Sequence, residues 1–238
     1  MAETTRLDRL WPAAMAAGLE GAPWAAFCDA LATERLVLAL DAAAVDTLTP
    51  TVLETGAGPL ALVFDREARL SAAVSRATER AHLDGRTLLP MLADAGLGLA
   101  LNPGAGASET VLAPAQVAWI AETFCRAPEA AEEAAPLGPP PPPAPGLLET
   151  LGARLADFGA EHVAEAWLAG LGEGHVLLLA PADGLPGDIA GEMAAALARL
   201  GQAASPDPFA AALAAPGSAR LETARRLGIA IRIGPETA

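Results

Sequence analysis

Five consecutive prolines, Pro139 to Pro143, divide this 238-residue chain more sharply than any other feature. Proline fixes φ and has no backbone N–H, so a proline series favours the extended polyproline II conformation. We therefore expect segment 127–146 to join neither a helix nor a sheet and to be a semi-rigid linker between two domains. A sharper alternative is that the run is itself a ligand for a polyproline-binding module.

The linker separates two segments, 1–126 and 147–238, each of a length typical of a small domain. The hydrophobic fraction is 53%, but alanine supplies much of it and buries little area. The cores must therefore depend on the Leu, Val, Ile, Phe and Trp positions.

Charge and composition exclude several classes of function. The formal net charge is −14, and the 15 basic residues are all scattered arginines with one adjacent pair, Arg225 and Arg226. An acidic chain without a basic stripe predicts no nucleic-acid and no anionic-membrane partner. The absence of lysine excludes Schiff-base chemistry, covalently held pyridoxal phosphate and a Walker A loop.

Cys28 and Cys125 are the only cysteines. Two cysteines in a chain of this length do not form a disulfide scaffold, so we expect buried free thiols in a reducing compartment. We find no apolar run of about 20 residues, and acidic residues and Pro12 interrupt the N-terminal segment that a signal peptide would need. These features predict a cytoplasmic protein.

In the first domain, apolar runs, turn residues and helical periodicity predict an α+β fold with a mixed sheet and no long parallel crossovers. Asp65 is a candidate N-cap for one of the helices, and Pro114 opens another at its first position. The expected helices are one or two within 7–31, then 66–76, 87–95 and one beginning at 114; the expected strands are 36–40, 52–55, 60–64, 97–101 and 110–112.

In the second domain, the pattern predicts the order helix, strand, strand, helix, strand, helix, strand. This order fits a small antiparallel sheet with helices on one face. Three helices are expected: one that begins at 147, one over 186–200 with Ile189, Met193, Leu197 and Leu200 inward, and one that follows the N-cap Ser218. The expected strands are 162–168, 175–179, 209–213 and 229–233, although the alanines in 162–168 also permit a helix.

Several stretches together resemble the SseB family, named for enhanced serine sensitivity. The residues that carry the resemblance are 58–65, 87–90, 98–104 (a strand running into Asn102-Pro103-Gly104), the strand 110–112 with the helix at Pro114, and 224–229 in the second domain. The resemblance implies an α+β layout with an N-terminal and a C-terminal domain, and a cytoplasmic location. It implies no catalytic residues.

A polar segment before the Asp84-Gly85 turn supplies the candidate ligand site. His82 and Asp84 stand two apart, which on a strand places them on one face, where they could form an oriented base. Arg80 and Arg86 could hold a carboxylate. The alternative is a solvent-exposed strand end, since no nucleophile accompanies the pair.

We expect no metal site and no cofactor, because the three histidines are dispersed and the glycines near residues 96–106 lack dinucleotide-loop spacing. The leading hypothesis is a non-enzymatic cytoplasmic binding or regulatory protein with a protein partner. The alternatives are a small-molecule sensor or enzyme, linked to amino acids, at the His82/Asp84 region, and an acidic secretion chaperone. A homo-oligomer formed through the edge at 229–233 stays open.

Overall fold

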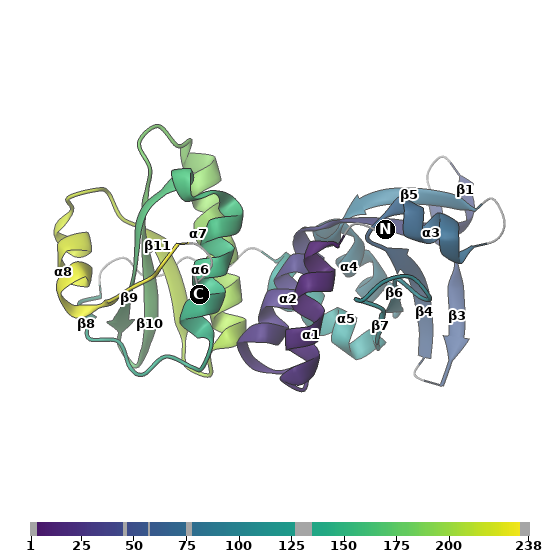
Figure 1. Cartoon of the computed structure of the whole chain (residues 1–238), viewed down its shortest axis with the longest axis horizontal. Helices are drawn as coiled ribbons and strands as arrows, with labels where there is room; N and C mark the ends of the chain where they lie inside the picture. The colour runs from purple at the N-terminus through teal and green to yellow at the C-terminus, as the bar shows by residue number, and fades with distance from the viewer. Residues whose placement is uncertain (1–3, 45–46, 57, 75–77, 127–134, 234–238) are drawn as a thin grey trace. The chain divides into compact units, whose positions relative to one another are not determined.

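The computed structural model describes residues 4–44, 47–56, 58–74, 78–126 and 135–233, and its fold is α+β (Figure 1). The chain divides into two compact units, residues 1–16 with 27–126 and residues 17–26 with 127–238. Each unit consists of a mixed sheet with helices packed on it, which confirms the predicted α+β class.

The first unit is built around a seven-stranded sheet in the order β2-β1-β4-β6-β7, with β3 beside β4 and β5 beside β1. Its helices are α1 (Arg6–Ala16), α2 (Gly21–Thr33, whose first residues belong to the other unit), α3 (Glu67–Ala73), α4 (Gly85–Asp94) and α5 (Pro114–Ile120), continued by a π-helical turn (Ala121–Cys125). Its strands are β1 (Arg35–Ala44), β2 (Thr47–Pro50), β3 (Val52–Thr55), β4 (Gly58–Phe64), β5 (Glu79–Asp84), β6 (Gly98–Leu101) and β7 (Thr110–Leu112).

Side chains alternate between the two faces of this sheet. Val37, Ala39 and Phe64 form a buried cluster with Leu70 of α3 on one face. The intervening residues face the other side, where α4 and α5 lie (Figure 1). Both faces are therefore apolar along the central strands, which accounts for their unbroken hydrophobic runs.

Two expectations for the first unit are wrong. β4 and β6 are parallel, with Leu60 opposite Gly98, so a long crossover through α3, β5 and α4 does join them. Asp65 does not cap α3: Arg66 occupies the N-cap position without a side-chain bond, because the Asp65 carboxylate pairs with Arg69 instead. α3 ends at Ala73, and the predicted extension to Arg76 reaches residues 75–77, outside the described ones.

The second unit holds a five-stranded sheet in the order β11-β10-β9-β12, with β8 also beside β9. Its strands are β8 (Leu137–Gly138), β9 (Val163–Leu171), β10 (Gly174–Pro181), β11 (Phe209–Leu213) and β12 (Ile229–Ala230). Its helices are α6 (Leu147–Phe158), a short 3-10 turn (Ala160–His162), α7 (Gly187–Ala204) and α8 (Ala219–Leu227). The predicted order of elements is confirmed, and Ser218 accepts a hydrogen bond from the Leu221 N–H as the predicted N-cap of α8.

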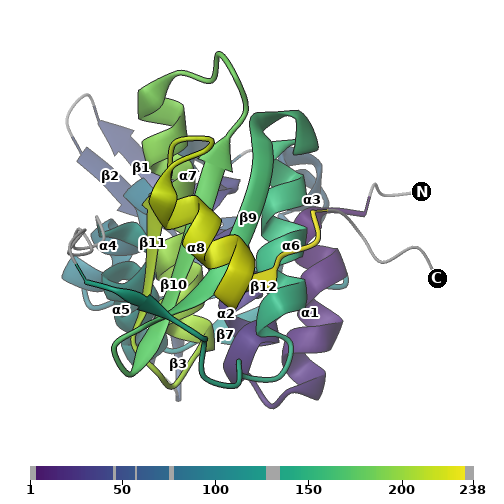
Figure 2. The ribbon, with the colours of Figure 1, turned by 90° about the vertical axis from the view of Figure 1, so that its left-hand side faces the viewer.

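Three details of the second unit differ from expectation. The sheet is mixed rather than antiparallel, because β10 and β11 are parallel. Helices cover both faces rather than one: Ala224 of α8 packs on Val176 and Leu178, and α6 and α7 lie on the opposite side of the sheet (Figures 1 and 2). Ile189, expected inward on α7, is 44% exposed.

The segment around the proline run contains the largest correction. Leu137 and Gly138 do join a sheet, pairing antiparallel with Leu171 and Gly170 of β9. The prediction that 127–146 stays outside any sheet is therefore wrong for these two residues, which precede the prolines and keep their backbone N–H groups. Positions 127–134 of the predicted linker lie outside the described residues.

Candidate functional site

The four ligand residues proposed from sequence lie along edge strand β5 and at the start of α4. Arg80, His82 and Asp84 are exposed, whereas Ala81 and Leu83 between them are half-buried. The three polar side chains therefore share one face of the strand, as their spacing predicts.

Glu67 of α3, which sequence reasoning did not single out, supplies the partner for two of them. Its carboxylate pairs with the Arg80 guanidinium, and its Oε2 lies 3.4 Å from His82 Nε2. The side chains of Glu67 and Arg80 are 46% and 43% exposed, so solvent screens this pair and it stabilises the fold little.

Asp84 and Arg86 do not join this cluster. Asp84 lies opposite Arg35 in the β1–β5 register and makes no side-chain cap bond to α4. Among the described residues, no hydrogen-bond partner lies near the buried Nε atom of Arg86. The structure therefore brings together Arg80 and His82, around a carboxylate of the protein itself, and not all four residues.

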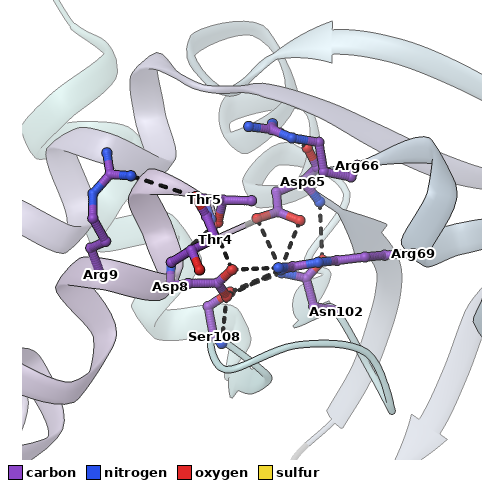
Figure 3. A network of polar contacts seen from close by, with 9 residues as sticks. All are labelled: Thr4, Thr5, Asp8, Arg9, Asp65, Arg66, Arg69, Asn102 and Ser108. Carbon is purple, nitrogen blue, oxygen red and sulfur yellow. Dashed lines mark hydrogen bonds and ion pairs between the residues drawn. The ribbon is translucent and has the colours of Figure 1, made fainter. Parts of the chain in front are cut away.

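A second polar cluster lies in the interior of the first unit, at the carboxyl ends of the parallel strands β4 and β6 (Figure 3). Asp65 follows β4 directly, and Asn102 follows β6. In open α/β sheets this edge is where ligands commonly bind. We call Asp8, Asp65, Arg69, Asn102 and Ser108 the buried network, since all five are less than a tenth exposed.

Arg69 of α3 is the centre of the buried network (Figure 3). Its Nη2 pairs with Asp8 Oδ2, and its Nη1 donates to Asp8 Oδ1 and Asp65 Oδ2, both at 3.1 Å. One guanidinium thus holds two carboxylates that are 61 and 4 residues away in sequence, which ties α1 to the β4–α3 junction. A planar guanidinium suits such multiple pairing better than any other cation.

Asn102 and Ser108 complete the buried network from the loop between β6 and β7. Asn102 Oδ1 accepts from the Asp65 N–H at 3.0 Å, and its Nδ2 donates to Ser108 Oγ at 3.0 Å. The Ser108 N–H and Oγ donate to Asp8 Oδ1 at 3.0 and 2.8 Å. Asn102 has φ of 48°, a left-handed conformation that asparagine tolerates better than most residues.

Gly106 lets the same loop close over Arg69. Its φ is 117°, and a Cβ there would lie 2.6 Å from Arg69 Nη1. Only glycine combines this backbone conformation with so close an approach. The loop therefore seals the guanidinium from one side.

The electrostatics of the buried network favour its charged form. Burial disfavours the Asp8 carboxylate, but hydrogen bonds from Arg69, Thr5 and Ser108 outweigh it, so the pKa of Asp8 lies well below its usual range. The hydrogen bond with Asp8 raises the pKa of Arg69 in turn. Both oxygens of Asp8 accept hydrogen bonds, and a carboxylate held in this way is a poor proton acceptor, so Asp8 is suited to structure rather than to acid–base chemistry.

The sequence carried only part of the signal for the buried network. Asn102-Pro103-Gly104 is conspicuous as a turn, but Asp8 and Ser108 are 100 residues apart, and no local pattern joins them. Asp65 four residues before Arg69 is the one local indication, because an (i, i+4) spacing places the two side chains together on a helix.

The second unit has a surface ion cluster and a buried histidine. Arg225 of α8 pairs with Glu165 and Glu222, and Glu165 Oε2 also accepts from Trp167 Nε1 at 2.8 Å. His175 of β10 is 1% exposed, and its Nε2 lies 3.2 Å from the carbonyl oxygen of Pro141 in the proline run.

Neither cysteine is in a disulfide; Cys28 is buried and Cys125 is half-buried. Burial, followed by the nearby charge of Asp29, raises the pKa of Cys28 well above its usual value, so this thiol is unreactive. Within the described ranges, no cluster of three or more His, Cys, Asp or Glu side chains is arranged to hold a metal ion. Of the helices in those ranges, none is both long and apolar enough to cross a membrane.

Comparison with known proteins finds no match to this chain among family models, curated proteins or solved structures.

Proposed function

We propose that this chain is a non-enzymatic, cytoplasmic binding or regulatory protein of the SseB type that acts through a protein partner. The observation that carries the proposal is the buried network. It occupies the carboxyl ends of β4 and β6, the edge at which a small ligand would be expected. Arg69 fills that position with both of its carboxylate partners paired.

The residues behind the family resemblance support the same proposal. The stretch 98–104 consists of β6 and the turn that carries Asn102, and the stretch 58–65 consists of β4 and Asp65. Both stretches end in the buried network, where they stabilise the fold. Because these stretches stabilise the interior of the first unit, we expect the outer surface of the protein to carry its function.

Affinity capture with the tagged full-length chain from the cytosol of its source, quantified by mass spectrometry, tests the proposal. We expect a stoichiometric protein that binds again when both components are purified. A chain that stays without a partner and turns over a metabolite, with turnover lost in His82→Ala, would overturn it.

A small-molecule sensor or enzyme at β5 is the second candidate, and one observation favours it. Arg80 and His82 already surround one carboxylate, that of Glu67, and an amino-acid carboxylate offers the same chemistry. A ligand would have to displace Glu67, so Glu67→Ala should strengthen binding.

Melting of the wild-type chain and of Glu67→Ala with millimolar serine and related amino acids tests this candidate. Stabilisation of Glu67→Ala that disappears when Arg80→Ala is added would support it. Unchanged melting in both proteins would remove it.

A further inference from the structure

The proline run and its neighbours expose every third residue. Pro136, Pro139, Pro142 and Pro145 are exposed, whereas each residue between Pro136 and Pro145 at another position is half-buried. Polyproline II has three residues per turn, so residues spaced by three form one ridge. We call these four prolines the proline ridge.

The backbone of the run is of the polyproline II type for a stereochemical reason. Each proline fixes its own φ, and a residue before proline is restricted to extended ψ values. No described peptide bond is cis, so the run is the trans, extended form. The threefold exposure agrees with this conformation.

The second unit fixes the run at three places along the chain: before it, at its middle and after it. Before it, Leu137 and Gly138 pair with β9. At its middle, the Pro141 carbonyl accepts from His175 at 3.2 Å. After it, Leu147 begins α6 and is fully buried.

The contact between His175 and the Pro141 carbonyl is a hydrogen bond in the protein interior. A carbonyl oxygen only accepts, so Nε2 carries a proton and donates it to this hydrogen bond. Nδ1 is buried, and the described part of the chain offers it no hydrogen-bond partner. The hydrogen bond from this buried histidine to Pro141 fixes the position of the run.

Gly170 of β9 makes room for the run. A Cβ at this position would lie 2.4 Å from the Pro139 carbonyl oxygen. The backbone of the run therefore lies directly against β9 at the Gly170–His175 pair. Together with His175, this close approach keeps the same side of the run against the sheet and the proline ridge outward.

Packing of the run against the second unit does not explain why every exposed position in it is a proline. The half-buried positions include Leu137, Gly138 and Ala144, whereas all the outward positions from 136 to 145 are prolines. An apolar ring at each outward position is what a groove lined with aromatic side chains recognises in a polyproline II ligand. Such a groove gains affinity when its ligand is already ordered, because less conformational entropy is lost on binding.

We propose that the proline ridge is the docking surface for a protein module that binds polyproline II in an aromatic-lined groove. This inference rests on the proposed binding function and names the class of partner. The exposed Glu149 in the first turn of α6 and the net charge of −14 favour a module whose groove has a basic rim.

Two matched double variants of the full-length chain test the proposal. Pro139→Ala with Pro142→Ala removes two rings from the ridge, and Pro140→Ala with Pro143→Ala removes two half-buried rings at the same spacing. Both pairs lower the polyproline II preference equally, so only a ridge-specific contact distinguishes them. Hydrogen exchange of the Leu137 and Gly138 amides checks that the run stays docked. If the ridge double variant does not stay docked, the single variant Pro142→Ala replaces it.

The binding assay is calorimetric titration of the chain against a panel of purified WW and Src-homology-3 domains that differ in rim charge. We expect at least one basic-rimmed domain to bind with a Kd below about 1 mM. The ridge variant should weaken that binding roughly tenfold or more, and the control variant should change it by less than about twofold.

Absence of binding to every domain in the panel, or equal weakening by both double variants, would overturn the proposal. Affinity capture separates this failure from failure of the proposed function. A stoichiometric partner retained equally by the wild-type chain and the ridge variant would keep the binding function and reject the ridge as its surface.

Discussion

Replacing Arg69 with methionine should remove a large part of the stability of the first unit. Arg69 is 7% exposed and is the cation that pairs with Asp8 and Asp65, so Arg69→Met leaves two buried carboxylates without it. Breaking a buried ion pair by removing one partner costs about 3–5 kcal/mol. That is a large part of the roughly 5–15 kcal/mol by which domains are stable.

The expected loss corresponds to a large shift in denaturation. Dividing about 4 kcal/mol by a urea m-value of about 2 kcal/mol/M gives a midpoint lowered by about 2 M. The assay is unfolding in urea, monitored by the hydrogen exchange of peptides from β4 and β6. These peptides report the first unit separately from the second. The deficit should shrink on acidification toward about pH 4, because the unpaired carboxylates then become protonated.

Arg225→Met is the matched control. Arg225 also pairs with two carboxylates, Glu165 and Glu222, but at the surface, where such pairs contribute little. Arg225 lies in the second unit, so this control is read from peptides of β9 and β10, and its unfolding midpoint should stay close to that of the wild type. A midpoint for Arg69→Met lowered by less than about 0.5 M, or a change equal to that of Arg225→Met, would refute the reasoning.

Three further predictions use other features of the first unit. Gly106→Ala should destabilise it by more than Gly104→Ala, because both have positive φ but only the new Cβ at 106 meets the buried guanidinium; thermal melts of the two variants compare them. The pKa of Asp8 is lower in the folded state than its unfolded value of about 3.9, so its stabilising contribution is complete at neutral pH and is lost below about pH 4; urea midpoints measured from pH 7 to pH 3 should fall, and flat midpoints would contradict the assignment. A thiol reagent at pH 8 should modify the native chain at Cys125 well before Cys28, and equal rates at the two thiols would show that Cys28 is not sealed.

The elements were largely predictable because their signals are local. The run Leu36–Leu40 and the periodicity after Pro114 each fix one element through its own side chains, and the structure places a strand and a helix there. The alternation at 229–233 is confirmed only in part, because the strand covers Ile229–Ala230 alone. What failed depends on pairing between distant segments. The parallel β4–β6 and β10–β11 pairs have no local signature, because a buried strand is apolar on both faces whichever direction its neighbours run.

The candidate sites follow the same rule. The face shared by Arg80 and His82 was predictable from their spacing, but Glu67 between them was not, because the β1–β5 pairing and α3 bring it there. Asp65 was assigned to the wrong role, since an N-cap and an ion pair with Arg69 compete for the same carboxylate. The buried ion pair with Arg69 outweighs a cap, which contributes about 1 kcal/mol.

The proline run shows the limit of composition as a guide. Prolines in series do predict an extended segment with few donors, and the segment is extended. Composition could not predict that the second unit would hold the run, because His175 and Gly170 lie far along the chain. By its composition the segment 127–146 is a linker, but its second half is packed against the second unit.

The most direct test of the account is reconstitution of the chain with its captured partner from purified components, followed by size-exclusion chromatography with light scattering. The account predicts one complex whose mass equals the sum of the two proteins in a simple ratio, formed without any added metabolite. Elution of the chain by itself at micromolar concentration, together with a melting shift by an amino acid that requires Arg80, would contradict it and assign the function to the β5 edge.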